Sequence, residues 1–145
     1  MIRFLLSAAI LLAATTAPAH ASNDTNIAGH WSFAARLNSD CSFGGTAYLE
    51  HLGDGKYKGE LTARQSCGYL EEDFLVRQDC KANVFGNQVS VRCRIVEFVN
   101  GFDSATYYPD NFTLTIGTPA RMHGALVSSG LAKPAEWTRS EGGIS

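Results

Sequence analysis

Cysteine and histidine are the side chains of this sequence whose types and spacing could carry chemistry. The four cysteines could form two disulfides or hold a zinc ion: Cys41, Cys67, Cys80 and Cys93. A zinc site would favour paired cysteines two residues apart and a nearby histidine pair, and neither is present. Three of the four histidines are candidates for catalytic or metal-binding residues: His30, His51 and His123. None of them belongs to a Ser–His–Asp triad order or to an HExxH motif. We therefore predict two disulfides and no metal, no cofactor and no catalytic set.

The segment from Cys80 to Cys93 predicts a β-hairpin with a disulfide near its base. Its centre is Gly86-Asn87, a dipeptide type favoured in two-residue hairpin loops. Counting outward from this loop places Cys80 opposite Cys93, on the face shared by alternate apolar residues. The same count makes them a non-hydrogen-bonded pair, whose Cα atoms lie about 4.5 Å apart, within disulfide range. By elimination Cys41 pairs with Cys67, one of three possible connectivities.

Eight segments with alternating polarity and flanking turn residues supply the elements around this hairpin. No sustained helical period occurs after the first apolar run. Short sequential connections favour an all-β fold, a single antiparallel up-and-down eight-stranded β-barrel, over a sandwich, because closure leaves no exposed sheet edge. The expected strands are 29–37, 46–52, 57–63, 74–80 with its continuation into the hairpin, 88–98, 112–116, 122–126 and 135–139.

Residues 1–21 have the layout of a secretory signal peptide, with Arg3 before an apolar run and Ala19-His-Ala21 at the cleavage site. The apolar run is shorter than the ~20 residues of a membrane-spanning helix. We expect residues 22–145 to form the barrel domain in the periplasm or outside the cell, where disulfides persist. Without Arg3 this domain has eleven basic and fourteen acidic residues. That balance argues against nucleic acid or an anionic membrane as partner.

Two motifs resemble those of the lipocalin and avidin-like barrels. Gly29-His-Trp31 opens the first expected strand, and Trp137-Thr-Arg139 closes the last. In lipocalins a Gly-x-Trp packs beneath an arginine from near the C-terminus. The resemblance implies that Trp31 closes one end of the barrel and that Arg139 lies across its ring in a cation–π contact.

The front half of the chain, Gly29-x-Trp31 followed by Cys41 and Cys67, also resembles the small periplasmic metalloprotease inhibitors of the Inh type. Those proteins are eight-stranded barrels that insert an N-terminal arm into the protease cleft. The second disulfide and the aromatic loop at 102–108 depart from that pattern. The resemblance implies protease inhibition through the arm from Ser22 to Ile27.

A carboxylate and an amide are expected among aromatic side chains inside the barrel. With Asp54-Gly55 as a two-residue loop, alternation turns Glu50 inward beside Gly59. The ligand-binding residues predicted for such a pocket are Glu50, Gln78, Tyr48 and Tyr57. The alternative is a barrel filled by side chains, in which a bulge turns Glu50 outward or Glu50 pairs with Arg139. An eight-stranded barrel allows either arrangement.

The connection from 98 to 110 is the longest and is rich in aromatic residues. Exposed aromatic side chains on a loop are usual anchors of a protein interface, and the residues predicted here are Phe102, Tyr107 and Tyr108. The same rings could instead cover the barrel mouth as a hydrophobic lid. We expect a non-enzymatic protein that binds a protein partner through the N-terminal arm or the 102–108 loop. Inhibition of a protease is one form that this binding could take. The alternative is a carrier of a small hydrophobic ligand.

Overall fold

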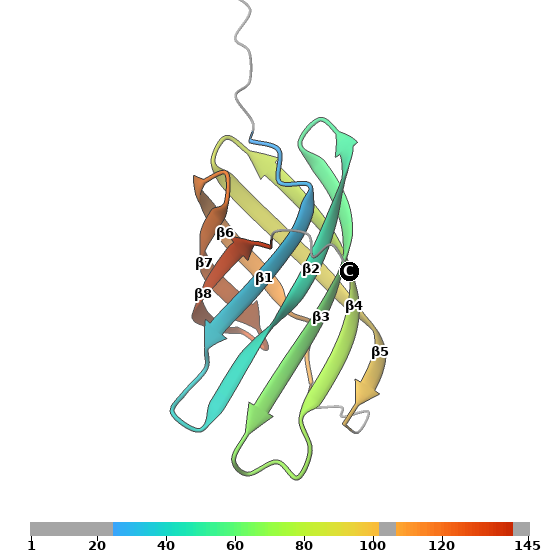
Figure 1. Cartoon of the computed structure of the whole chain (residues 1–145), viewed down its shortest axis with the longest axis vertical. Coiled ribbons are helices and arrows are strands. Elements are labelled where there is room, and N and C mark those ends of the chain that lie inside the picture. The colour runs from blue at the N-terminus through green and yellow to red at the C-terminus, as the bar shows by residue number, and fades with distance from the viewer. Residues whose placement is uncertain (1–24, 102–106, 141–145) are drawn as a thin grey trace, which may run out of the picture.

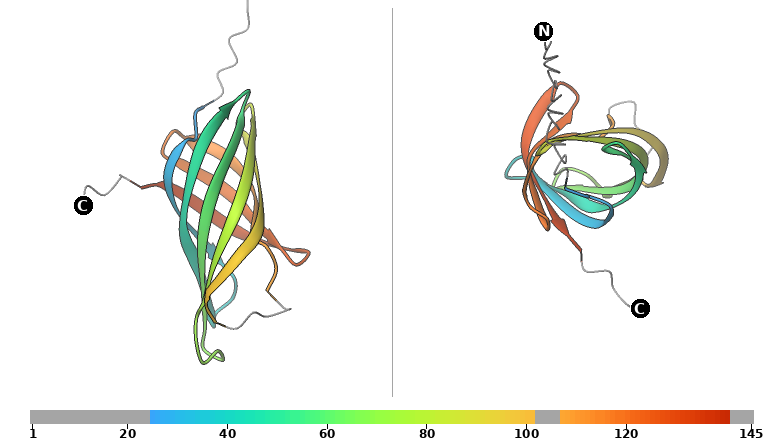
Figure 2. Two further views of the ribbon diagram at one scale, coloured as in Figure 1. Left: turned by 90° about the vertical axis from the view of Figure 1, so that its right-hand side faces the viewer. Right: turned by 90° about the horizontal axis from the view of Figure 1, so that it is seen from above.

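A computed structural model describes residues 25–101 and 107–140 and shows one closed antiparallel β-barrel (Figure 1). Each strand pairs with the next along the chain, and the last pairs with the first (Figure 2). The strands are β1 (Gly29–Arg36), β2 (Cys41–Gly53), β3 (Lys56–Cys67), β4 (Phe74–Phe85), β5 (Gln88–Asn100), β6 (Asn111–Thr118), β7 (Arg121–Ser128) and β8 (Leu131–Arg139). The predicted fold class is therefore confirmed. The expected signal peptide lies outside the described residues.

The β4–β5 hairpin has the predicted register. Phe85 lies opposite Gln88 across the two-residue loop, and Cys80 lies opposite Cys93. The disulfide between these cysteines joins Cα atoms 4.1 Å apart. The second disulfide, Cys41–Cys67, links the first residue of β2 to the last residue of β3. Both predicted disulfides are confirmed, and each joins two neighbouring strands.

The pairing register of the β2–β3 hairpin differs from the predicted register by one residue. Gly53 pairs with Lys56 across the turn, but the next pair joins His51 to Tyr57, so Leu52 is an extra residue in β2. A single-residue bulge transfers every preceding side chain to the other face of the strand. The bulge that turns Glu50 outward, considered above as an alternative, is thus the arrangement that forms.

Two inward-facing glycines allow neighbouring strands to approach closely where the barrel curves. A Cβ atom at Gly45 would lie 2.0 Å from the carbonyl oxygen of Thr62, and one at Gly59 would lie 2.2 Å from that of Tyr48. Real Cβ atoms do not tolerate such distances, so both positions require glycine. Glycine kinks of this kind introduce the curvature that closes small barrels.

Aromatic side chains fill the middle of the barrel. The Trp137 ring stacks on Phe33 at 5.4 Å and meets Phe112 edge-on at 5.1 Å between ring centroids. All three residues are buried. Such contacts between aromatic rings stabilise the fold by more than the burial of their apolar area alone. A ligand inside this barrel must therefore lie toward one end.

Candidate functional site

One end of the barrel, called here the closed end, is sealed by the residues that precede β1. Ile27 is 1% exposed and belongs to the hydrophobic core. Its backbone N–H donates to the hydroxyl of Tyr57 at 3.3 Å, and its carbonyl accepts from Nε1 of Trp31 at 2.9 Å. Ile27 is therefore a plug, and the last residue of the expected inhibitory arm is not free to enter a protease cleft. Residues 22–24 of that arm lie outside the described part of the chain.

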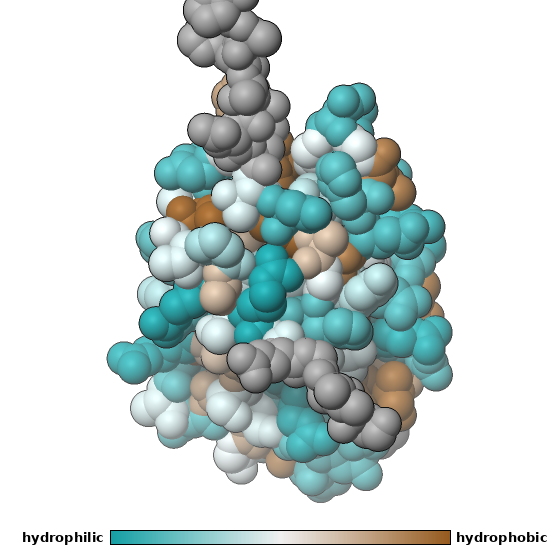
Figure 3. All heavy atoms as spheres, turned by 45° about the horizontal axis from the view of Figure 1, so that its top comes forward, coloured by the Kyte–Doolittle hydropathy of each residue, from teal (hydrophilic) through white to brown (hydrophobic). Residues whose placement is uncertain are grey.

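Arg139 fastens the plug from outside. Its guanidinium carbon lies 4.4 Å from the centroid of the Trp31 ring. Its three nitrogens donate to the carbonyl oxygens of Asn26, Ala28 and Pro119. The cation–π contact that the lipocalin resemblance implied between Arg139 and Trp31 is thus present. In Figure 3, which brings this end forward, hydrophilic residues cover most of the visible face and hydrophobic residues are scattered.

We expect Arg139→Met to lower the free energy of unfolding by about 2 kcal/mol, because three charge-assisted hydrogen bonds and a cation–π contact are lost while the apolar stem is kept. Urea unfolding followed by Trp fluorescence measures the loss. Arg36→Met is the matched control, because Arg36 is exposed on β1 and makes no ion pair among the described residues. Equal stability of the two variants would contradict the fastening role.

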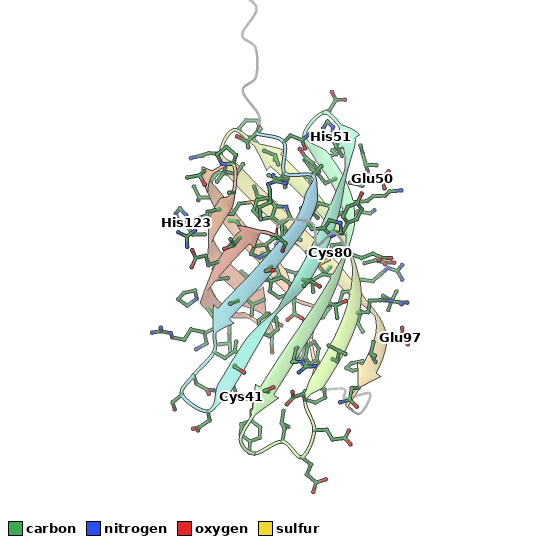
Figure 4. All side chains as sticks on the ribbon, in the orientation of Figure 1. Cys41, Glu50, His51, Cys80, Glu97 and His123 are labelled. Atoms are coloured by element: carbon green, nitrogen blue, oxygen red, sulfur yellow. A yellow bond between two sulfur atoms is a disulfide. The ribbon has the colours of Figure 1, made fainter. Side chains whose placement is uncertain are left out.

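The opposite end contains a cavity of about 600 Å³, called here the mouth cavity. Cys41, which lines it, lies at the far end of the barrel from His51 (Figure 4). Its apolar lining includes Leu37, Phe43, Phe74 and Leu126, and its polar lining includes Gln65, Tyr107, Asp110, Ser128 and Lys133. A concave, mainly apolar cavity of some 300–1,000 Å³ with a few polar groups is the usual form of a small-molecule site.

A buried polar network forms part of the wall of this cavity. Nε2 of Gln78 donates to Oδ2 of Asp110 at 2.6 Å, and the backbone N–H of Asp110 donates to Oε1 of Gln78 at 2.9 Å. The hydroxyl of Tyr107 donates to the same Oδ2 at 2.8 Å. Gln78 is 0% exposed and Asp110 is 3% exposed. These bonds attach the segment before β6 to β4.

Burial changes the acidity of both ionisable members of the network. Desolvation raises the pKa of Asp110 to about 6, although the hydrogen bonds from Tyr107 and Gln78 act in the opposite direction. Desolvation also raises the pKa of Tyr107, and the nearby charge of Asp110 adds to that effect. Tyr107 therefore stays a hydrogen-bond donor at neutral pH.

The predicted partner-binding residues have different surroundings. The Tyr107 ring packs on Phe74 at 5.4 Å and on Phe98 at 5.9 Å between centroids, so it is packed against β4 and β5. Tyr108 is 50% exposed. Phe102 lies outside the described residues. Partner binding at these positions stays a prediction.

The four predicted ligand-binding residues do not come together. Because of the Leu52 bulge, Glu50 (Figure 4) and Tyr48 lie on the outer face rather than inside, where the prediction placed them. Glu50 forms an ion pair with Lys58 at 3.3 Å. Gln78 and Tyr57 are buried as predicted, but Tyr57 supports the plug of the closed end, whereas Gln78 holds Asp110 at the mouth cavity.

The two charged residues among those that line the mouth cavity, Lys133 and Asp110, were missed by the sequence prediction. Lys133 shares the inward face of β8 with Ala135 and Trp137, so simple alternation would have found it had the expected strand begun before 135. Asp110 lies outside any strand and follows a proline, and no local pattern marks it as buried.

His30, His51 and His123 are all exposed. His51 nevertheless lies on the inward face at the end of β2, because the Leu52 bulge pairs it with the buried Tyr57, and their ring centroids are 4.9 Å apart. Across residues 25–101 and 107–140, no group of three or more histidine, cysteine, aspartate or glutamate side chains is placed to hold a metal ion. Nor does any helix in these two ranges have the length and hydrophobicity needed to cross a membrane.

Comparisons with known proteins support the fold and no more. No protein-family model matches the chain, and a search of curated proteins finds no match. Among solved structures, the chain is similar to a redesigned β-barrel, b11L5F_LGL, with a TM-score of 0.59 and 12% identity over 79% of this chain and 92% of that one. A fluorescence-activating β-barrel designed de novo matches with a TM-score of 0.56 and 13% identity over 78% and 93%. The redesigned barrel mFAP1, bound to DFHBI, matches with a TM-score of 0.59 and 10% identity over 79% and 94%.

Proposed function

We propose that the protein is a non-enzymatic carrier that holds a small, mainly apolar ligand in the mouth cavity. The observation that carries this proposal is the shape of the barrel, which is plugged at the closed end, filled by aromatic rings in the middle and hollow at the mouth. The cavity of about 600 Å³ has an apolar lining and a few polar groups at its wall.

The fold and the disulfides are compatible with this role. The barrel mFAP1, which has a similar fold, is bound to DFHBI, so a barrel of this architecture can hold a small ligand. Two disulfides indicate an oxidising compartment. We propose the periplasm or the extracellular space as the place where the ligand is carried.

Blocking the cavity tests the proposal. We expect Ser128→Trp to weaken the binding of the neutral apolar dye Nile red at least tenfold, because Ser128 lines the cavity and an indole there would occupy it. Fluorescence titration measures the change. Thr113→Trp is the matched control, since Thr113 is exposed on β6 and does not line the cavity.

Two results would contradict the carrier role. The first is dye binding that Ser128→Trp leaves unchanged. The second is a wild-type protein that binds no dye and that, purified from its own host, shows only the bare chain mass in native mass spectrometry.

A protein partner is the second candidate function, and it has its own support at the mouth. Tyr69, Tyr108 and Leu131 all line the mouth cavity and are 73%, 50% and 62% exposed. Exposed aromatic groups around a rim are suited to an interface. We place this function second because Ile27 of the N-terminal arm is buried and the Tyr107 ring packs on Phe74 and Phe98, which leaves less of these groups exposed to a partner.

A further inference from the structure

We propose that the ligand of the mouth cavity is an amphiphile with a single negative charge, whose anionic head group pairs with the ammonium of Lys133 and whose apolar tail lies against Phe43, Phe74 and Leu126. This inference rests on the proposed carrier function and adds the chemical class of the ligand.

The inward position of Lys133 is the first support. Lys133 is paired with Leu126 across β7 and β8, and directly paired side chains share one face of a sheet. Leu126 is 3% exposed and belongs to the core, so this face is the inner one. Lys133 is half-buried and lines the mouth cavity, unlike the exposed Lys56, Lys58 and Lys81.

The charge of Lys133 has no counterion among the described residues. The ion pairs in this part of the chain join Glu50 to Lys58, Asp73 to Arg64, Glu97 to Arg77, Asp79 to Arg94 and Glu136 to Arg121. The buried carboxylate of the cavity, Asp110, accepts its hydrogen bonds from Gln78 and Tyr107 instead. A half-buried ammonium attracts an anion more strongly than a fully solvated one, because fewer water molecules screen it.

The charge and polarity of the cavity select among ligand classes. A cationic amphiphile would place its head group beside an unpaired ammonium, and the two would repel each other. A fully neutral apolar ligand would displace water from that ammonium without replacing its hydrogen bonds. Lys133 is the only cationic side chain among the described residues that line the cavity, and the one carboxylate among them, Asp110, accepts hydrogen bonds from Gln78 and Tyr107 in the wall. The cavity therefore suits one negative charge better than two.

Displacement of Nile red by three ten-carbon ligands with different head groups tests the inference. We expect the wild-type protein to bind decanoate about tenfold more tightly than decanol, which corresponds to ~1.4 kcal/mol, and to bind decyltrimethylammonium most weakly. Lys133→Met should weaken decanoate binding about tenfold and leave decanol binding unchanged, whereas Lys133→Arg should keep the preference. Lys81→Met is the matched control, because it removes the same charge from the outer face of β4.

The outcomes separate this inference from the proposed function. If decanoate and decanol bind equally, if Lys133→Met leaves decanoate binding unchanged, or if Nile red binds and none of the three ligands displaces it, the anionic-amphiphile inference is wrong and the carrier function stands. If neither the dye nor any of the three ligands binds a folded wild-type protein, the carrier function itself is wrong. Melting temperatures of all variants establish that each is folded.

Discussion

Replacing Gly45 with alanine is expected to lower the free energy of unfolding by about 3 kcal/mol or more. The new Cβ atom would lie 2.0 Å from the carbonyl oxygen of Thr62 and 2.7 Å from Cζ of Phe33. The backbone oxygen belongs to the β2–β3 pairing, so it can move only if the two strands separate at this point. Urea unfolding followed by far-ultraviolet circular dichroism measures the loss.

Gly68→Ala is the matched control for this substitution. Gly68 lies in the β3–β4 connection, and a Cβ atom there would have no neighbour within 4 Å. We expect its stability to stay within about 0.5 kcal/mol of the wild type. If Gly45→Ala were equally harmless, the close approach of β2 and β3 would not be a requirement for closing the barrel.

The stability of the protein is expected to fall as the pH rises from about 4 to about 6, through the contribution of Asp110. Burial raises the pKa of Asp110 from 3.8 to about 6, so between these values the folded state binds more protons than the unfolded state. Folding is then favoured by protons, and the contribution present below the lower value is lost as the pH passes the upper one. This shift in the pKa of Asp110 corresponds to a contribution of about 3 kcal/mol to the free energy of unfolding.

Comparison with Asp110→Asn isolates this contribution from those of other groups. An amide cannot ionise, so the variant should lack the fall in stability between pH 4 and 6 that the wild type shows. Asp54→Asn, which changes an exposed turn residue, should keep it. Thermal unfolding at several pH values measures the stability of each protein. If the stabilities of the wild type and of Asp110→Asn changed in parallel with pH, Asp110 would titrate normally in the folded protein.

Most of the fold was predictable because its signals are local. In the β4–β5 hairpin, the loop dipeptide, the alternation of polarity and the spacing of the cysteines all require the same register, and that register forms. In the β2–β3 hairpin the loop dipeptide was also correct, but Leu52 is apolar and fits the alternation of an unbroken strand. The glycine at position 53, with a φ of 102°, is the signal of irregular pairing that the prediction did not use.

The candidate site was less predictable because its contacts join distant segments. Gln78 and Asp110 are 32 residues apart, and their pairing depends on where the segment before β6 meets β4. No periodic pattern encodes such a contact. Lys133 was missed for a simpler reason, because Pro134 was expected to precede the last strand and instead lies within it.

The plug of the closed end also determines where the protein can be attached to something else. Ile27 and Arg139 both lie at that end, and the backbone N–H of Ser140 donates to the carbonyl of His30 at 2.9 Å, so the first and last described segments lie next to each other there. A tether, tag or fusion partner joined beyond either of these segments would thus be attached to the barrel at the closed end and not at the mouth cavity. Molecules immobilised in this way would present their binding cavity to the surrounding solution. The protein is therefore suited to attachment in one orientation on a sensor surface.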